Sequence, residues 1–159
     1  MPALQTLIEA LDRASAEYDV LEHPRTETAR AEARALGLDA GDVAKTVVVK
    51  TPDGYLRVVL PASERLDLPR LRELVGGGHH THLASEDDLA REYPEFDLGA
   101  VPPFGGSTGD RVVVDTRIAA RDRVVLEAGD HSHSIRLRVA DLMRAAHEPE
   151  IADVCQATG

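Results

Sequence analysis

The chain has 159 residues, enough for one ordinary domain, and is 43% hydrophobic and 29% charged, so it can bury a core. No stretch holds the roughly 18 apolar residues that a membrane span needs, and the single cysteine, Cys155, excludes an internal disulfide and a four-thiolate zinc site. The net charge of −10 argues against wrapping a nucleic-acid duplex, but not against holding the end of one strand. The N-terminus lacks the pattern of a signal peptide. We expect one cytoplasmic domain over residues 1–159.

The first third of the chain predicts two helices and a hairpin. Apolar residues recur at helical spacing over residues 4–14, and residues 18–23 are typical of a strand that Pro24 ends. An alanine-rich helix is expected over residues 26–36. The β-branched run 43–50, the turn Pro52-Asp53-Gly54 and the return strand 55–60 predict a β-hairpin.

The rest of the chain alternates short elements with loops. We expect helices at 68–75, 85–93 and 140–146, and strands at 79–83, 111–115, 124–128 and 134–139. Residues after Pro149 are expected to form a short helix or to fray. This order of elements predicts a mixed α/β fold, with a curved, largely antiparallel sheet surrounded by helices.

Lys45 is the most informative single residue. The chain has only two lysines, Lys45 and Lys50, and otherwise uses arginine. Side chains alternate along a strand, so Lys45 shares a face with Val47 and Val49, whereas Lys50 points the other way. Burial among valines lowers the pKa of an amine, and a nearby phosphate or carboxylate restores its charge. The alternative is a lysine at a strand end that extends to water.

The segment from Gly99 to Gly106 is the second candidate for the site. Glycine lets a backbone approach a ligand closely, and Pro102-Pro103 makes the segment rigid. Its N–H groups can hold an oxyanion or a small polar substrate. The alternative is an ordinary tight turn.

Histidines form two groups, His79, His80 and His82, and His131 with His133. Two histidines two residues apart on a strand share a face and can bind zinc. These groups, however, lie beside glycine-rich and aspartate-rich turns, where exposed histidines are common, so we predict no metal site. His23 ends a strand and can face a cleft, with a purely structural role as the alternative.

In combination, these segments resemble the YbaK family of aminoacyl-tRNA deacylases, which is related to the editing domain of prolyl-tRNA synthetases. The motifs that carry the resemblance are Glu22-His23-Pro24, Ala44-Lys45-Thr46-Val47-Val48-Val49, Arg65-Leu66-Asp67-Leu68, Gly99-Ala100-Val101-Pro102-Pro103-Phe104-Gly105, Val112-Val113-Val114-Asp115, Glu127-Ala128-Gly129 and Asp141-Leu142. They span nearly the whole chain and occur in the family's order.

The resemblance implies a barrel-like sheet and hydrolysis of the ester between an amino acid and the 3′ end of a tRNA, without a cofactor. It places Lys45, Gly99, Pro103, Phe104 and Gly105 in the catalytic site. The substrate-binding residues that we expect beside them are His23, Thr46, Gly106, Ser132 and His133.

The mechanism that we expect uses Lys45 to hold the terminal adenosine phosphate or to polarise the ester carbonyl. The loop N–H groups then hold the developing oxyanion, and water or a group of the substrate attacks. Alanine, serine, cysteine and proline are the candidate amino acids. The tRNA binds a local arginine patch, or a synthetase delivers it. The patch is drawn from Arg65, Arg70, Arg111, Arg117, Arg121 and Arg123. We expect the protein to be a monomer or a homodimer. The alternative is a non-catalytic binding module for an aminoacyl compound, tRNA or small molecule that regulates a partner protein.

Overall fold

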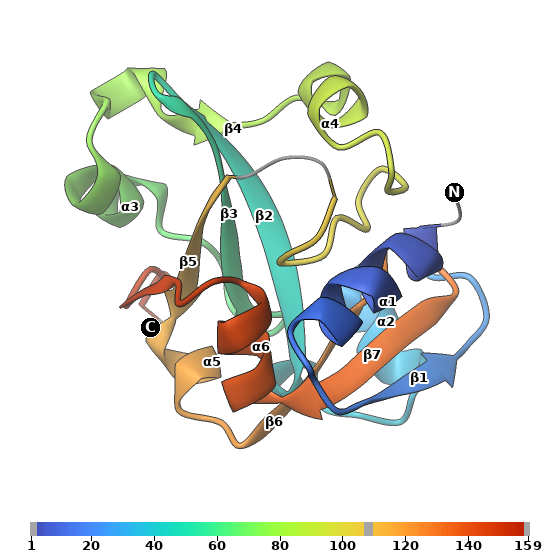
Figure 1. Ribbon diagram of the computed structural model, residues 1–159. Helices are drawn as coiled ribbons and strands as arrows, with labels where there is room; N and C mark the ends of the chain where they lie inside the picture. The colour runs from blue at the N-terminus through green and yellow to red at the C-terminus, as the bar shows by residue number, and fades with distance from the viewer. Residues whose placement is uncertain (1–2, 107–109, 158–159) are drawn as a thin grey trace.

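The computed structural model describes residues 3–106 and 110–157, in which eight strands form one mixed sheet with helices on both sides (Figure 1). The strand order is β1-β7-β6-β2-β3-β5-β8, and β4 pairs with β2 outside this path. The helices are α1 (Ala3–Arg13), α2 (Ala29–Ala35), α3 (Leu68–Val75), α4 (Glu86–Glu92), α5 (Thr116–Ala119) and α6 (Val139–Ala145), with 3-10 turns at Ala40–Asp42 and Gly78–His80. The strands are β1 (Tyr18–Glu22), β2 (Val43–Thr51), β3 (Gly54–Pro61), β4 (His82–Leu83), β5 (Arg111–Asp115), β6 (Arg123–Glu127), β7 (His133–Arg138) and β8 (Glu150–Ala152).

The predicted hairpin forms the centre of the sheet and is confirmed. Thr51 pairs with Gly54, so that Pro52 and Asp53 make a two-residue turn. The Thr51 hydroxyl closes this turn, because it accepts from the Asp53 N–H at 3.2 Å and donates to the Gly54 carbonyl at 2.9 Å. Gly54 has φ 129°, which a residue with a Cβ adopts only with strain.

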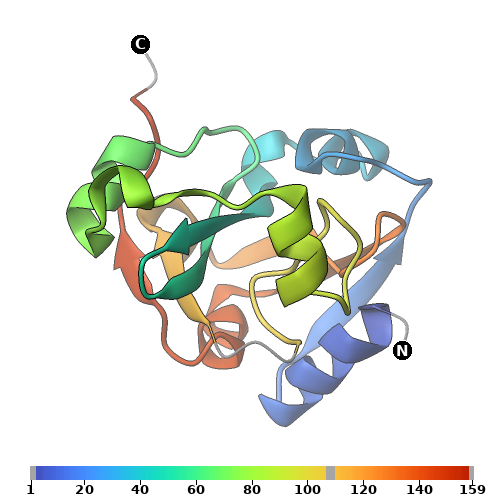
Figure 2. The same ribbon diagram turned by 90° about the horizontal axis from the view of Figure 1, so that it is seen from above.

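The sheet combines both kinds of pairing and is not closed. Strands β1–β7, β7–β6, β2–β3 and β2–β4 pair antiparallel, whereas β2–β6, β3–β5 and β5–β8 pair parallel. Within the described ranges no ladder joins β1 to β8, so the barrel-like sheet that we expected stays open. The long β2–β3 hairpin runs up through the molecule in Figure 1, and the view from above looks down on its turn end (Figure 2). The predicted mixed fold with a largely antiparallel sheet is confirmed.

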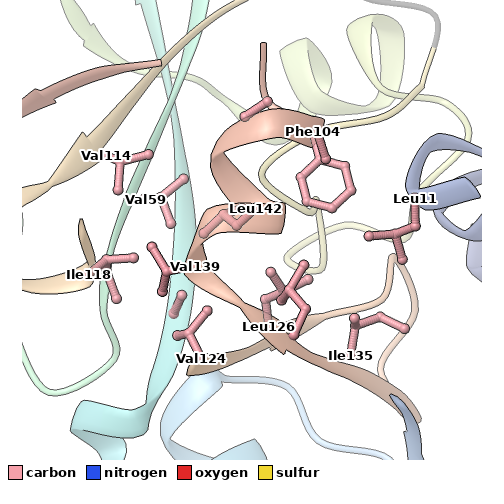
Figure 3. Close-up of a cluster of buried hydrophobic side chains, with 14 of the residues drawn as sticks. Leu11, Val59, Phe104, Val114, Ile118, Val124, Leu126, Ile135, Val139 and Leu142 are labelled. Carbon is pink, nitrogen blue, oxygen red and sulfur yellow. The ribbon is translucent and has the colours of Figure 1, made fainter. Parts of the chain in front are cut away.

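The hydrophobic core is divided between the two faces of the sheet. Leu11 of α1, Leu126 of β6 and Leu142 of α6 belong to the cluster on one face (Figure 3). On the other face, Leu71 of α3 and Ala33 of α2 belong to two separate clusters. Among the described residues no helix is long and apolar enough to cross a membrane.

The predicted short helix or frayed tail after Pro149 is wrong. Strand β8 pairs parallel with β5, and the buried Asp115 carboxylate accepts from the Val154 N–H at 2.9 Å. Cys155 forms an isolated bridge with Leu66. A three-residue strand whose partner lies far back in the sequence leaves no local periodicity, so the sequence pattern missed it.

Candidate active site

Strand β2 has a complete partner on one edge and two partial partners on the other. Strand β3 pairs with it along residues 44–51. On the opposite edge β6 pairs only with Val43 and Ala44, and β4 pairs only with Val49 and Lys50. Thr46 lies between these two ladders, so within the described residues no strand covers its backbone.

The backbone groups of Thr46 point toward this uncovered edge. Because Thr51 and Gly54 close a two-residue hairpin, the hydrogen bonds to β3 fall on odd-numbered residues of β2. The Val48 carbonyl faces the other way and accepts from the Ala84 N–H at 3.0 Å. The N–H and carbonyl of Thr46 have the same orientation as those of Val48, and together offer a donor and an acceptor to a ligand.

The side chain of Lys45 lies on the face of the sheet that α2 and α3 cover. Val43, two residues before it, packs with Ala33 of α2. Val49, four residues after it, packs with Leu71 of α3. Since side chains two residues apart share a face, Lys45 lies in the interval between these two clusters. The expectation that it has valine neighbours on its own face holds.

The charge of Lys45 has no partner within the described part of the chain. The residue is half-buried, and its amine makes neither an ion pair nor a hydrogen bond with a described residue. Burial lowers the pKa of Lys45, and the nearby cations Arg30 and Arg65 lower it further, whereas Cys155 and Glu64 act in the opposite direction. An amine in this setting gains most from a bound anion.

The second candidate segment lies on the opposite face of the sheet. Ala44 belongs to the same cluster as Phe104, and Val48 to the same cluster as Val101. Thr46 shares this face with Ala44 and Val48. The loop and the Lys45 side chain therefore approach β2 from different sides.

Arg57 holds the end of this loop from within. It is 1% exposed, and its guanidinium donates to the Pro102 carbonyl at 2.8 Å and to the Gly105 carbonyl at 2.7 Å. Its third contact is an ion pair with Asp110 at 2.9 Å, and Asp110 also accepts from the Tyr93 hydroxyl at 2.5 Å. Arg57 was not among the predicted site residues, although an arginine inside an apolar strand is the signal that points to it.

The ring of Phe104 belongs to the core. It is 3% exposed and lies with Leu11 and Leu142 (Figure 3). The neighbouring Gly105 has φ 86°, and a Cβ there would lie 3.4 Å from the Cβ of Ala10. Pro103 is buried as well. These residues fix the shape of the loop, and their predicted catalytic role stays a prediction.

Phe96 joins the loop to the turn that follows β6. A Cβ at Gly106 would lie 3.0 Å from its ring, and a Cβ at Gly129 would lie 2.7 Å from it. The Asp97 N–H also donates to the Gly129 carbonyl at 2.9 Å. Both glycines are therefore needed for the close approach of their backbones to one aromatic ring.

His131 fixes the other end of the loop. It is 2% exposed, which contradicts the interpretation of an exposed turn histidine. Its Nε2 lies 2.7 Å from the Leu98 carbonyl, and since a carbonyl only accepts, Nε2 carries the proton. Gly99 follows with φ 82° and stays exposed. The loop thus begins at a histidine contact and ends at an arginine contact.

His23 and Ser132 lie on the same side of the molecule as α2. The His23 N–H donates to the Ser132 carbonyl at 3.0 Å, and its Nε2 lies 2.9 Å from the Ser134 hydroxyl. The His133 ring contacts Asp130, with Nδ1 2.9 Å from the carboxylate. The structure therefore brings His23 and Ser132 together and gives Ser134, which was not predicted, the contact with the His23 ring.

The remaining candidates for chemistry are the other histidines and the cysteine. In the described ranges no group of three or more His, Cys, Asp or Glu side chains is arranged to hold a metal. Cys155 is buried, and burial raises the pKa of its thiol to about 12, which keeps it from acting as a thiolate nucleophile.

The model of an aminoacyl-tRNA editing domain matches residues 23–145, more than half of the chain. The chain belongs to the aminoacyl-tRNA editing domain family. The matched range contains the uncovered edge of β2, the 99–106 loop and the turn after β6. No curated protein matches the chain.

Three solved structures support the fold of this editing domain. A protein described as a candidate trans-editing enzyme for prolyl-tRNA synthetase has a TM-score of 0.88 at 24% identity, with 99% of each chain covered. A scaffold protein used for computational epitope grafting has a TM-score of 0.87 at 24% identity, again over 99% of each chain. The hypothetical protein APE2540 has a TM-score of 0.86 at 24% identity, over 95% of this chain and 99% of its own.

Proposed function

We propose that this editing domain is a trans-acting deacylase that hydrolyses the ester of a mischarged aminoacyl-tRNA. The observation that carries the proposal is the half-buried Lys45 amine, which forms no ion pair with a described residue and lies beside the uncovered backbone of Thr46. The substrate supplies both missing partners, because it has phosphates and an ester carbonyl. Acting on aminoacyl-tRNA places the protein in the cytoplasm, in contact with tRNA.

Lys45 supplies the positive charge in this mechanism. Arg30 and Arg65 lie near it, and neither forms an ion pair with a described residue. These three cations suit the phosphates at the 3′ end of a tRNA, because the nearby carboxylate of Glu64 also pairs with Arg117 at 3.9 Å. The lysine then holds the terminal phosphate or polarises the ester carbonyl.

Backbone donors near Thr46 and at the start of the loop complement this charge. The Ala100 N–H is already bound to the Asp97 carbonyl at 3.0 Å. The N–H groups of Gly99 and Val101 have no hydrogen-bond partner among the described residues. Donors of this kind stabilise an oxyanion, and the loss of one costs about 3–4 kcal/mol of activation free energy in hydrolases. Attack then comes from water or from a group of the substrate.

Most of the arginines expected to bind the acceptor stem are neutralised within the chain. Arg70, Arg111, Arg117, Arg121 and Arg123 each form an ion pair with a carboxylate. Direct tRNA binding therefore rests on Arg30 and Arg65 beside Lys45. A small acyl group such as alanyl, seryl, cysteinyl or prolyl fits this proposal, and a synthetase remains a candidate for delivering the tRNA.

The decisive experiment is a panel of mischarged tRNAs incubated with the wild-type chain, Lys45→Ala and Lys50→Ala. Lys50 is the matched control, since it is the other lysine of β2 and interacts with Asp88 at 3.8 Å. We expect release of a small amino acid by the wild type and Lys50→Ala, and a loss of at least about 100-fold in kcat/KM for Lys45→Ala. Full activity of Lys45→Ala excludes the proposed role of Lys45. No release from any tRNA supports the binding module instead.

A salt titration of tRNA binding tests the cationic group. Arg30→Ala and Arg65→Ala should each reduce the slope of log K against log salt by about 1, because each phosphate contact releases counterions. Arg70→Ala is the control, since this arginine pairs with Asp153 at 3.1 Å. Equal slopes in all variants would exclude phosphate contacts by Arg30 and Arg65 and would favour delivery of the tRNA by a synthetase.

A further inference from the structure

Three polar side chains from different elements form a continuous hydrogen-bonded chain beside the site. Nε2 of His23, after β1, lies 2.9 Å from the Ser134 hydroxyl of β7. The Ser134 hydroxyl in turn donates to the Glu32 carboxylate of α2. Nδ1 of His23 lies 2.8 Å from the Pro24 carbonyl. This series of hydrogen bonds thus runs from the half-buried His23 ring to the Glu32 carboxyl, which has no exposed surface.

Glu127 of β6 lies at the inner end of this chain. Its carboxyl lies close enough to that of Glu32 for the Glu32 charge to raise its pKa, and neither carboxyl forms an ion pair with a described residue. Two neighbouring buried carboxyls do not both ionise, so one of them holds a proton. Burial raises the pKa of both, and the Glu32 charge raises that of Glu127 further, so Glu127 carries the shared proton.

The hydrogen bonds also fix how many protons His23, Ser134 and Glu32 hold together. The Pro24 carbonyl can only accept, so Nδ1 of His23 is always protonated. If Glu32 is ionised, Ser134 donates to it and Nε2 must donate to Ser134, which makes His23 a cation. If Glu32 is protonated, it donates to Ser134, Ser134 donates to Nε2, and His23 is neutral. Both arrangements satisfy every donor, and they differ only in the place of one proton.

We propose that Glu32 and Ser134 are positioning residues that act through His23, forming a relay which carries one proton between the buried carboxyl and the imidazole. The relay orients the His23 ring and lets its charge change without exchange with solvent. Hydrogen bonds connect the His23 segment to the loop through the turn after β6: the His23 N–H binds the Ser132 carbonyl, the Thr26 N–H binds the His131 carbonyl at 2.9 Å, and the His131 ring binds the Leu98 carbonyl. A negative charge that develops on the substrate near His23 is therefore stabilised by the imidazolium cation that the relay supplies.

Other ionisable groups lie on the elements around the relay. These are Glu27 before α2, Arg30 on α2, Glu22 at the end of β1, and Asp130, His131 and His133 in the turn between β6 and β7. Asp130 and Glu27 raise the pKa of Glu127. They therefore keep the inner proton in place, while the outer proton remains free to move between Glu32 and His23.

The first experiment does not depend on activity. Nitrogen NMR of the His23 ring in the substrate-free protein reports whether each ring nitrogen is protonated. We expect Nδ1 to be protonated and Nε2 to lie between the protonated and bare limits in the wild type, and Glu32→Gln to move Nε2 to one limit. Asp141→Asn is the matched control, because Asp141 is also a buried carboxylate, but it pairs with Arg144 away from the relay. An Nε2 signal that is the same in wild type and Glu32→Gln overturns the relay.

The second experiment tests the role in deacylation, which rests on the proposed function. After subtraction of spontaneous ester hydrolysis, the wild-type kcat should fall as rising pH removes the Glu32 proton. The pH at which it falls should lie well above the ordinary glutamate pKa of about 4.3. Glu32→Gln should abolish this fall and lower kcat at neutral pH roughly 10-fold, with KM within about twofold. Asp141→Asn should keep the wild-type profile.

Substitutions of Ser134 separate a relay from simple packing. Ser134→Ala removes the hydroxyl that connects Glu32 to His23, so it should abolish the fall in activity with pH as Glu32→Gln does. Ser134→Thr keeps the hydroxyl and should restore the wild-type profile. If Glu32→Gln changes the NMR signal but leaves the pH profile intact, the positioning role is excluded. If the wild type releases no amino acid, the proposed function fails, and the NMR result still decides the relay.

Discussion

Lys45 and Phe104 belong to the two segments that mark the site, and the fold holds them in opposite ways. Lys45 is half-buried, and its amine has no partner within the described chain. Phe104 is 3% exposed and packs in the core, in a loop whose Pro102 and Gly105 carbonyls accept from Arg57. The contacts that fix the two ends of the loop come from within the chain, whereas Lys45 has no ion-pair partner among the described residues.

The difference shows which kind of function each segment can have. An unpaired, partly desolvated amine gains free energy when an anion binds, so Lys45 is suited to act on a substrate. A loop tied to the core at both ends keeps its backbone in a fixed shape, which is what a preorganised oxyanion site needs. Changes in the loop should therefore lower stability first, and changes at Lys45 should affect function first.

The largest expected effect on stability follows from Arg57→Met. This substitution leaves Asp110 buried without its cation and removes the donors of Pro102 and Gly105. Breaking a buried pair in this way costs about 3–5 kcal/mol. Urea denaturation followed by circular dichroism measures the loss.

Arg13→Met is the control for Arg57→Met, because Arg13 is an exposed arginine of α1. We expect it to change the free energy of unfolding by less than about 0.5 kcal/mol. Equal stabilities of the two variants would mean that the internal contacts of the loop do not hold it.

Gly129→Ala should have the next largest effect. Its Cβ would lie 2.7 Å from the Phe96 ring at a backbone φ of 95°. Overpacking and left-handed strain together cost about 1–3 kcal/mol. Gly37→Ala separates the two causes, since Gly37 has φ 70° and no atom within 4 Å of a Cβ. Thermal unfolding should show a larger loss for Gly129→Ala, and equal losses would exclude the steric contact with Phe96.

Phe104→Leu tests whether Phe104 acts through packing. Because the ring lies in the core cluster, a volume-similar leucine should cost less than about 1.5 kcal/mol and leave kcat within a few-fold. Deacylation assays and urea denaturation of the same sample measure both quantities. A large loss of kcat with little loss of stability would place the ring at the reacting atoms, as the catalytic assignment of Phe104 expects.

Local patterns in the sequence were sufficient to predict the hairpin, most of the helices and the valine neighbours of Lys45. They were sufficient because each depends on residues close in the chain, such as the turn at Pro52 and the β-branched run around Lys45. Strand β8 was missed because it depends on a parallel partner far away in sequence.

The site was predicted only as separate motifs, since residues from distant segments complete it. Arg57 acts on carbonyls 45 and 48 residues later in the chain, and Ser134 donates to a carboxylate on α2. No spacing in the sequence relates Glu32 to Glu127 or Ser134. Nor does the sequence reveal that β6 and β4 leave Thr46 uncovered, because that gap results from where two ladders end.

The smallest expected effect is a gain in stability, and it comes from Lys45→Met. Because burial and nearby cations lower the pKa of Lys45, the unfolded chain binds more protons than the folded one at alkaline pH, and wild-type stability at this site rises with pH. Lys45→Met should therefore stabilise the chain at pH 7 by less than about 1 kcal/mol. This gain in stability should vanish as the pH approaches the ordinary lysine pKa of about 10.4. Lys50→Met, which removes an exposed interaction with Asp88 at 3.8 Å, should not stabilise. A loss of stability in Lys45→Met would mean that the chain itself supplies the counter-charge.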